Sequence, residues 1–193
     1  MNFHRWTDKT FPPRFRSMIP RLQAKIPKMF GWEMASGHDL YLWLDGTFIL
    51  WRFGTVRWFV EQLGQADFAI FAHPSRETIR DEARMLREAL AIWDPYICSR
   101  YEREFLDEQM GAIPTDYPDD RLYAAGAFIY RDLPKTRAAL TDWWVHTSRY
   151  HTDDQLSLPY VLWKHKVAVK VLPGFFYDHN GACLFRAKGA RIA

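Results

Sequence analysis

The chain contains 193 residues, of which 48% are hydrophobic and 17% are aromatic. A typical domain has about 100–200 residues, so we expect a single domain that spans residues 1–193. The 26 Lys and Arg residues outnumber the 23 Asp and Glu residues, but a net charge of +3 is too small to predict a nucleic-acid-binding protein.

Other sequence features bear on location and on cysteine chemistry. No apolar stretch reaches the roughly 20 uncharged residues that a membrane span needs, and the stretch MNFHRWTDKTFPPRFR lacks the apolar core of a signal peptide. We therefore expect a soluble, cytoplasmic protein. Cys98 and Cys183 each stand alone, which predicts neither a disulfide framework nor a structural zinc site.

The amino-terminal quarter of the chain predicts one short helix and one buried strand. The basic segment 14–30 contains Pro20 and Pro27, and these limit a helix to about Arg21–Lys25 because proline breaks helix interiors. The continuous apolar run Leu40–Leu44 indicates a strand covered on both faces, as in the middle of a mostly parallel sheet.

The next segments alternate between helix and strand. Apolar residues recur at helical spacing over residues 55–63 and 75–93, and Ser75 is placed to cap the second helix. Between these helices, DFAIFAH at residues 67–73 predicts a second buried strand.

The second half of the chain repeats this alternation. We expect helices over residues 96–110, 134–144 and 154–166. We expect strands over residues 124–131 and 167–172. Pro159 should kink the last helix or divide it into two short pieces. Strands that alternate with helices predict an α/β fold, with a mostly parallel central sheet flanked by helices.

Polar residues follow two of the predicted strands. Asp45 closes one strand and His73 closes the other, at the carboxyl ends where ligands bind in such folds. Gly46 would let the backbone turn after Asp45 without a Cβ clash. A turn or a helix cap is one role for Asp45. The other is a metal or ribose ligand, because hard divalent cations prefer carboxylate oxygens.

Two pairs of basic residues are spaced four apart, which places each pair on one helix face. Arg21 and Lys25 form the first pair, and Arg76 and Arg80 form the second at the start of a predicted helix, where backbone N–H groups attract anions. Such positive charge suits an anionic ligand. A solvated surface charge is the alternative for each residue, and we favour it for Arg80. Arg76 is expected to contact an anionic ligand such as phosphate, with Glu82 holding it or another basic group in place.

Two adjacent carboxylates, Asp153 and Asp154, stand where a helix is expected to begin. A carboxylate can accept the proton of an attacking hydroxyl, so both are candidate catalytic residues. Capping the helix is the alternative role. Gly126, inside a predicted strand, indicates a bulge or a close approach by a ligand.

Four stretches occur in the order LWLDG, FAHPSRETIRDEA, GAFIYR and DDQLSLPYVLWK. Together they resemble the small GT-A glycosyltransferases, in particular the plant and bacterial group with the pattern WxDG…H…R…EA…DQ and the amino-terminal domain of a chlorella-virus capsid-glycosylating protein. The resemblance implies a GT-A-like fold and transfer of a sugar from a nucleotide-diphosphate donor, commonly a UDP-sugar, to a glycan or glycoprotein hydroxyl. The viral relatives imply capsid glycosylation by a virus-encoded enzyme in the host cytoplasm.

The resemblance also implies a divalent metal, Mn²⁺ or Mg²⁺, at Asp45, which matches the carboxylate of the family's DxD-type motif. Trp43 and Thr47 stand where a complete motif has its aspartates. His179 matches the histidine with which many GT-A enzymes close the metal site, so that the two residues would form a mixed carboxylate and imidazole site. Asp178 is a rival ligand, and a surface position is the alternative for His179.

Further roles follow from the same resemblance. Trp6, Thr7 and Asp8 resemble the FTD segment that lies near the nucleobase and the ribose. Asp154 aligns with the aspartate of the DQ motif and is the candidate base for a transfer with inversion, and Gly126 would border the sugar.

Two other function classes stay open. A metal-dependent phosphohydrolase or nuclease would need clustered carboxylates for two metals, and the chain offers only the pairs Asp119 with Asp120 and Asp153 with Asp154. A non-catalytic nucleotide-sugar-binding module would bind the donor without turnover, and the incomplete DxD motif is compatible with it.

Overall fold

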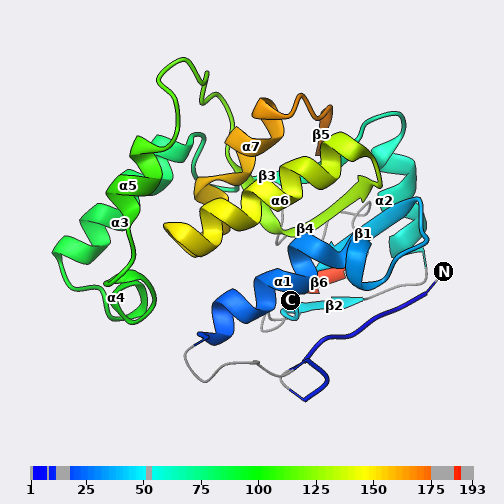
Figure 1. Cartoon of the computed structure of the whole chain (residues 1–193), viewed down its shortest axis with the longest axis horizontal. Helices are drawn as coiled ribbons and strands as arrows, with labels where there is room; N and C mark the ends of the chain where they lie inside the picture. Colours follow the sequence, from blue (N-terminus) through cyan, green and yellow to red (C-terminus); the bar gives the residue numbers. More distant parts are fainter. Residues whose placement is uncertain (1, 8, 12–17, 51–53, 175–184, 188–193) are drawn as a thin grey trace.

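The computed structural model describes residues 2–7, 9–11, 18–50, 54–174 and 185–187 (Figure 1). Its helices are α1 (Pro20–Met34), α2 (Thr55–Leu63), α3 (Ile79–Ala91), α4 (Pro95–Tyr101), α5 (Leu106–Gly111), α6 (Pro134–Arg149), the 3₁₀ turn η1 (Asp154–Leu156) and α7 (Leu158–Lys164). Its strands are β1 (Leu40–Leu44), β2 (Phe48–Leu50), β3 (Phe68–Ala72), β4 (Tyr123–Arg131), β5 (Val169–Leu172) and β6 (Phe185–Ala187).

The central sheet has four strands in the order β1-β4-β3-β5, and β2 pairs with β6 in a separate two-stranded sheet. β3 and β5 are parallel, whereas β4 is antiparallel to both β1 and β3. The α/β class is confirmed, but the expectation of a mostly parallel sheet is wrong. A buried apolar run such as β4 suits either direction, so the side-chain pattern of the strand did not reveal its direction.

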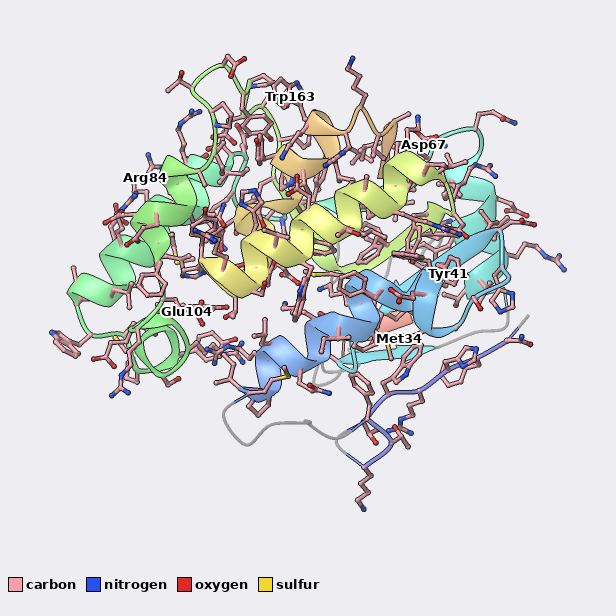
Figure 2. The ribbon with its side chains drawn as sticks, in the orientation of Figure 1. Met34, Tyr41, Asp67, Arg84, Glu104 and Trp163 are labelled. Atoms are coloured by element: carbon pink, nitrogen blue, oxygen red, sulfur yellow. The ribbon has the colours of Figure 1, made fainter. Side chains whose placement is uncertain are left out.

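β1 lies at the edge of this sheet and not in its middle, which corrects its predicted position. All five of its residues are half-buried, and β4 is its only partner among the described strands. Tyr41, which is labelled in Figure 2, stacks on Tyr130 of β4 with 5.3 Å between the ring centroids.

Helices cover both faces of the sheet (Figure 1). Phe68 of β3 and Phe128 of β4 pack in a cluster with residues of α1, α3, α6 and α7. Because side chains alternate along a strand, the next residues, Ala69 and Ile129, face the other way and pack with Phe59 of α2. The chain therefore forms three layers with the sheet in the middle.

Helix α1 is longer than predicted, because it continues through Pro27 to Met34. Pro20 lies in its first turn, where a missing N–H costs nothing. Non-helical dihedral angles occur at Phe30 (φ −116°, ψ 24°), so the helix bends after Pro27 instead of ending. Its buried face, which includes Met29, packs on the core, and this tertiary packing offsets the helix-breaking effect of proline.

Helix α3 starts later than predicted and is capped by Thr78, not Ser75. The Thr78 hydroxyl accepts a hydrogen bond from the N–H of Asp81 at 2.9 Å. The Asp119 carboxylate accepts hydrogen bonds from the N–H groups of Ile79 (2.7 Å) and Arg80 (3.2 Å). The first N–H groups of α3 are therefore already satisfied, and they are not available to an anionic ligand.

Two further helical predictions have different outcomes. The predicted helix 96–110 is two helices, α4 and α5, so its expected continuity is wrong. The division of the segment 154–166 into two short pieces is confirmed by η1 and α7, with Pro159 in the first turn of α7. Among the described helices, none is both long and apolar enough to cross a membrane.

Phe128 supports the main core, and its removal should destabilise the fold. Its ring is fully buried between Phe68 and Trp143, at centroid distances of 5.0 Å and 5.8 Å. We expect Phe128→Ala to lower the free energy of unfolding by about 3–5 kcal/mol in urea denaturation. Phe105→Ala is the control, because that ring is 56% exposed; its effect should stay within about 1 kcal/mol. Equal losses for the two variants would contradict this account of the core.

Candidate functional site

Two predicted site residues lie at one edge of the sheet, because β1 and β3 both run antiparallel to β4 and so share a direction. Asp45 follows β1, and its N–H donates to the carbonyl of Gly126 at 2.8 Å. His73 follows β3, and its N–H donates to the carbonyl of Leu122 at 2.9 Å. We call this side of the sheet the carboxyl edge.

A β-bulge in β4 shapes this edge and confirms the prediction at Gly126. Ile70 pairs with Phe128, but the next residue of β3, Phe71, pairs with Ala124. The residues of β4 between these pairs are left out of the ladder with β3. The proposed need for glycine at position 46 is wrong, because Gly46 lies outside the left-handed region and a Cβ atom would meet nothing within 4 Å.

A lysine–aspartate cluster lies at the carboxyl edge and consists of Lys25, Lys28, Asp45 and Asp154. The Nζ atoms of Lys25 and Lys28 each lie 2.5 Å from Oδ2 of Asp154. Nζ of Lys28 also lies 3.5 Å from Oδ1 of Asp45. Both lysines come from α1, three residues apart, so one helix face delivers the two ammonium groups to one carboxylate.

Tryptophan N–H groups hold the two carboxylate-bearing residues in position. Nε1 of Trp43 donates to Oδ1 of Asp45 at 2.6 Å, and Nε1 of Trp143 donates to the backbone carbonyl of Asp154 at 2.8 Å. Trp143 is fully buried in the core, so the segment that carries Asp154 is anchored to it.

Electrostatics keep the cluster charged. Burial alone would raise the pKa of Asp154, but the ammonium groups of Lys25 and Lys28 outweigh it and hold this pKa well below its usual range. Burial alone would lower the pKa of Lys28, but Asp154 and Asp45 outweigh it and raise this pKa. An aspartate held by two cations is a weak base, so the geometry gives Asp154 the role of positioning the lysines. Its catalytic role stays a prediction.

A second group of carboxylates adjoins this cluster. Asp153 is 7% exposed, and its charge helps to raise the pKa of Glu82 of α3, which is 2% exposed. Arg76 contacts both oxygens of Glu82, with Nη2 lying 3.2 Å from Oε1. The expected contact between Glu82 and Arg76 is confirmed. Asp153 also accepts a hydrogen bond from the N–H of Gln155 at 3.2 Å, so it caps η1.

The pKa values of Glu82 and Asp153 are both raised. Burial and the charge of Asp153 raise the pKa of Glu82 to about 7, although Arg76 opposes this shift. Burial and the charge of Asp154 likewise raise the pKa of Asp153. A carboxyl group whose pKa lies near 7 is matched to acid–base chemistry near neutral pH.

His73 is a neutral residue that orders the loop before α3. Its Nδ1 accepts hydrogen bonds from the N–H groups of Arg76 at 3.0 Å and Ser75 at 3.3 Å. Burial and the nearby Arg76 charge lower the pKa of His73 to about 4. Nε2 lies 3.2 Å from Nη2 of Arg76, and a guanidinium only donates, so both ring nitrogens face N–H donors.

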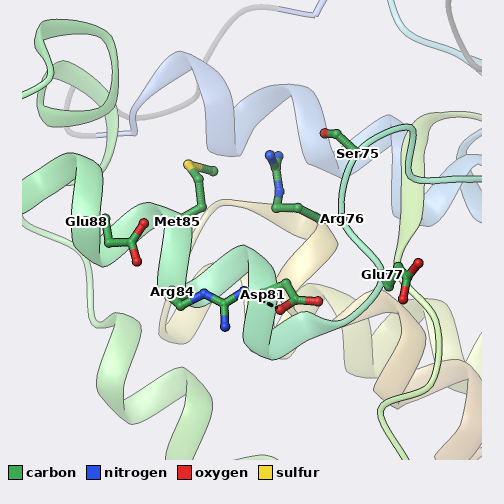
Figure 3. A pocket seen from close by; sticks show the side chains of 7 residues that line it. All are labelled: Ser75, Arg76, Glu77, Asp81, Arg84, Met85 and Glu88. Carbon is green, nitrogen blue, oxygen red and sulfur yellow. Dashed lines mark hydrogen bonds and ion pairs between the residues drawn. The ribbon is translucent and has the colours of Figure 1, made fainter.

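A hollow of about 440 Å³ lies beside this loop and the first turns of α3. It is lined by Ser75, Arg76, Glu77, Asp81, Arg84, Met85 and Glu88. Figure 3 shows Arg76 extending from the loop toward Met85 at the hollow. Arg76 therefore links the Glu82–Asp153 pair to a space that a ligand could enter.

Arg21 and Lys25 share a face of α1, as predicted; Arg21 reaches Thr152 before η1, and Lys25 reaches Asp154 at the start of η1. Nη2 of Arg21 lies 3.2 Å from Oε1 of Glu104, which follows α4 (Figure 2). Glu104 in turn accepts hydrogen bonds from the N–H of Thr152 at 2.5 Å and from its hydroxyl at 2.6 Å. Arg21 thus supports the loop that carries Asp153.

The remaining predicted residues are not brought to the carboxyl edge by any described contact. Thr7 is half-buried, and its hydroxyl accepts hydrogen bonds from the N–H groups of Lys9 and Thr10, both at 3.2 Å. Arg80 pairs with Asp119 at 3.2 Å with a 56% exposed side chain, in agreement with a surface charge. Asp8 and His179 lie outside the described residues.

The charged group next to Asp45 among the described residues is a lysine. Within the described ranges, no three His, Cys, Asp or Glu side chains are grouped so that they could hold a metal ion. The positive charge next to Asp45 is instead the ammonium of Lys28. Lys28 was not predicted as a site residue, because the helix was expected to end at about Lys25, before Pro27; the available signal was the spacing of three residues between Lys25 and Lys28.

Comparison of this chain with protein-family models, with curated proteins and with solved structures finds no match.

The raised pKa of Glu82 predicts a pH dependence of stability. Its folded value of about 7 exceeds an unfolded value of about 4.3, so the folded state binds this proton more tightly. The resulting stabilisation is fully present below the pKa that Glu82 has in the unfolded state. It is lost as the pH rises through the pKa that Glu82 has in the folded state. We expect the stability of the unmodified protein relative to Glu82→Gln to fall by about 2 kcal/mol between about pH 5 and pH 8, measured by urea denaturation.

Glu88→Gln is the matched control for this prediction, because Glu88 is an exposed carboxylate on the same helix. Contributions of titrating groups that are remote from Glu82 are common to these proteins and cancel in the comparison. Parallel pH profiles for the unmodified protein and Glu82→Gln would contradict the raised pKa of Glu82.

Proposed function

We propose that the chain is a glycosyltransferase that binds a nucleotide-diphosphate sugar at the carboxyl edge of its sheet. The supporting observation is that one contact network joins side chains from α1, the end of β1, the loop before α3, α3 and the start of η1. Its members are Lys25, Lys28, Asp45, Arg76, Glu82, Asp153 and Asp154.

Two cations of this network are placed to bind phosphate oxygens. The Lys25 side chain is 16% exposed, and its ammonium group has three N–H donors, of which Asp154 takes one. The Arg76 side chain is 26% exposed and borders the hollow beside α3. We assign both residues to the diphosphate, because its departure requires stabilisation of negative charge.

The Glu82–Asp153 pair supplies the acid–base function in this proposal. The acceptor oxygen forms a bond to the anomeric carbon, the bond from that carbon to the diphosphate breaks, and the hydroxyl proton passes to the carboxylate of Asp153. Asp153 is a better base than Asp154, because its pKa is raised, whereas two lysines hold the pKa of Asp154 down. Attack from the face opposite the diphosphate makes the transfer inverting.

The finer parts of the proposal rest on the sequence resemblance. The α/β layering supports a GT-A-like fold at the level of the fold class. A UDP-sugar donor, a hexosyl group and a glycan or glycoprotein acceptor are inferred from the four ordered motifs alone. The proposal contains no step through a metal.

A nucleotide-sugar-binding module without turnover is the second candidate. The burial of Glu82 and Asp153 favours it, because an acceptor hydroxyl must approach a base to be deprotonated. A phosphohydrolase that uses two metals gains no support from the pair Asp119–Asp120. Asp119 is occupied by the N–H groups at the start of α3 and by Arg80.

Calorimetric titration with nucleoside diphosphates and nucleotide sugars tests the proposal. We expect one nucleotide class to bind, and Lys25→Met to weaken that binding by at least about tenfold, which is about 1.4 kcal/mol. Lys164→Met is the matched control, because Lys164 pairs at 2.7 Å with Asp142 of α6 and not with the network. The nucleotide affinity of Lys164→Met should equal that of the unmodified protein.

Slow hydrolysis of the bound nucleotide sugar would then separate a transferase from a binding module. If no nucleotide of the panel bound to the folded protein, the proposed donor site would be wrong.

A further inference from the structure

Lys28 lies against the carboxylate for which the family resemblance implies a metal. Its side chain is 3% exposed, and its Nζ lies 3.5 Å from Oδ1 of Asp45. The same Oδ1 accepts the hydrogen bond of Trp43 Nε1 at 2.6 Å. A positive charge and an N–H donor therefore already lie against one of the two carboxylate oxygens of Asp45.

We propose that Lys28 is a resident counter-cation for Asp45 and excludes a divalent metal from this carboxylate. A hard divalent ion binds carboxylate oxygen at about 2.0–2.6 Å. A metal bound to Oδ1 would thus lie within a few ångströms of the ammonium nitrogen, where like charges repel strongly in a partly buried site.

Further contacts hold the ammonium group of Lys28 next to Asp45. Its Nζ lies 2.5 Å from Oδ2 of Asp154 and 5.6 Å from the centre of the Trp143 ring. Asp154 and Asp45 together outweigh burial and raise the pKa of Lys28, so the ammonium stays charged at neutral pH. Moving it away would leave a buried cation without its partners.

Lys25 provides an internal comparison. It shares the carboxylate of Asp154 at the same distance of 2.5 Å, but only Lys28 is paired with Asp45 among the described ion pairs. The two lysines therefore carry the same charge on the same helix and differ in their contact with Asp45. Metal exclusion should depend on Lys28 and not on Lys25.

The inference deepens the proposed function and rests on it in one respect. If a nucleotide-diphosphate sugar binds at the carboxyl edge, it binds in EDTA as well as in Mn²⁺, because the lysines provide positive charge that a metal would otherwise supply.

The test is a Mn²⁺ titration that follows the electron paramagnetic resonance signal of the free ion. It compares the unmodified protein with Lys28→Met, Lys28→Gln and Lys25→Met, each also combined with Asp45→Asn. We expect both Lys28 variants to bind Mn²⁺ at least about tenfold more tightly than the unmodified protein. Asp45→Asn should abolish this gain, and Lys25→Met should not produce it.

Lys28→Gln keeps an N–H donor for Asp154, so it preserves the test if Lys28→Met does not fold. Mn²⁺ affinities that are equal in the unmodified protein and the folded Lys28 variants, or a gain that persists without Asp45, would overturn the proposal. Nucleotide binding that requires Mn²⁺ would also overturn it. Failure of every variant to bind nucleotide would instead count against the proposed function, because the Mn²⁺ comparison needs no nucleotide.

Discussion

The carboxyl edge depends on one buried interaction, in which the ammonium groups of Lys25 and Lys28 share the carboxylate of Asp154. This contact joins α1 to the segment before α7 across more than a hundred residues of sequence. Burial of these charges costs free energy, and the cost is offset only if each charge has a partner within the protein. Trp143 of the core donates a hydrogen bond to the backbone carbonyl of Asp154. The hydrophobic core therefore anchors the segment that carries this carboxylate.

Two carboxylates that are neighbours in the sequence have opposite properties because their surroundings differ. Asp154 faces two lysines and stays ionised, whereas burial and neighbouring carboxylates raise the pKa values of Asp153 and Glu82. A site that separates the pKa values of adjacent acids in this way can fix charge with one and move a proton with the other. Arg76 contacts Glu82 and also lines the hollow beside α3, so these carboxyl groups lie near an accessible space.

The sequence predicted the local elements and part of the site, but not the partners that long-range packing selects. Strand boundaries at 40–44, the bulge at Gly126 and the meeting of Arg76 with Glu82 followed from local pattern and spacing. The direction of β4 did not, because a buried apolar strand suits either direction. Lys28 was missed because Pro27 predicted the end of a helix that tertiary packing extends to Met34.

A double-mutant cycle between Lys28 and Asp154 tests the central interaction most directly. The free energy of unfolding would be measured for Lys28→Met, Asp154→Asn and the double variant. Each single change leaves a buried charge less well paired and should cost about 3 kcal/mol or more. We expect the double change to cost less than the sum by at least about 1 kcal/mol. Costs that add within about 0.5 kcal/mol would show that the two residues are not coupled, and would contradict this account of the carboxyl edge.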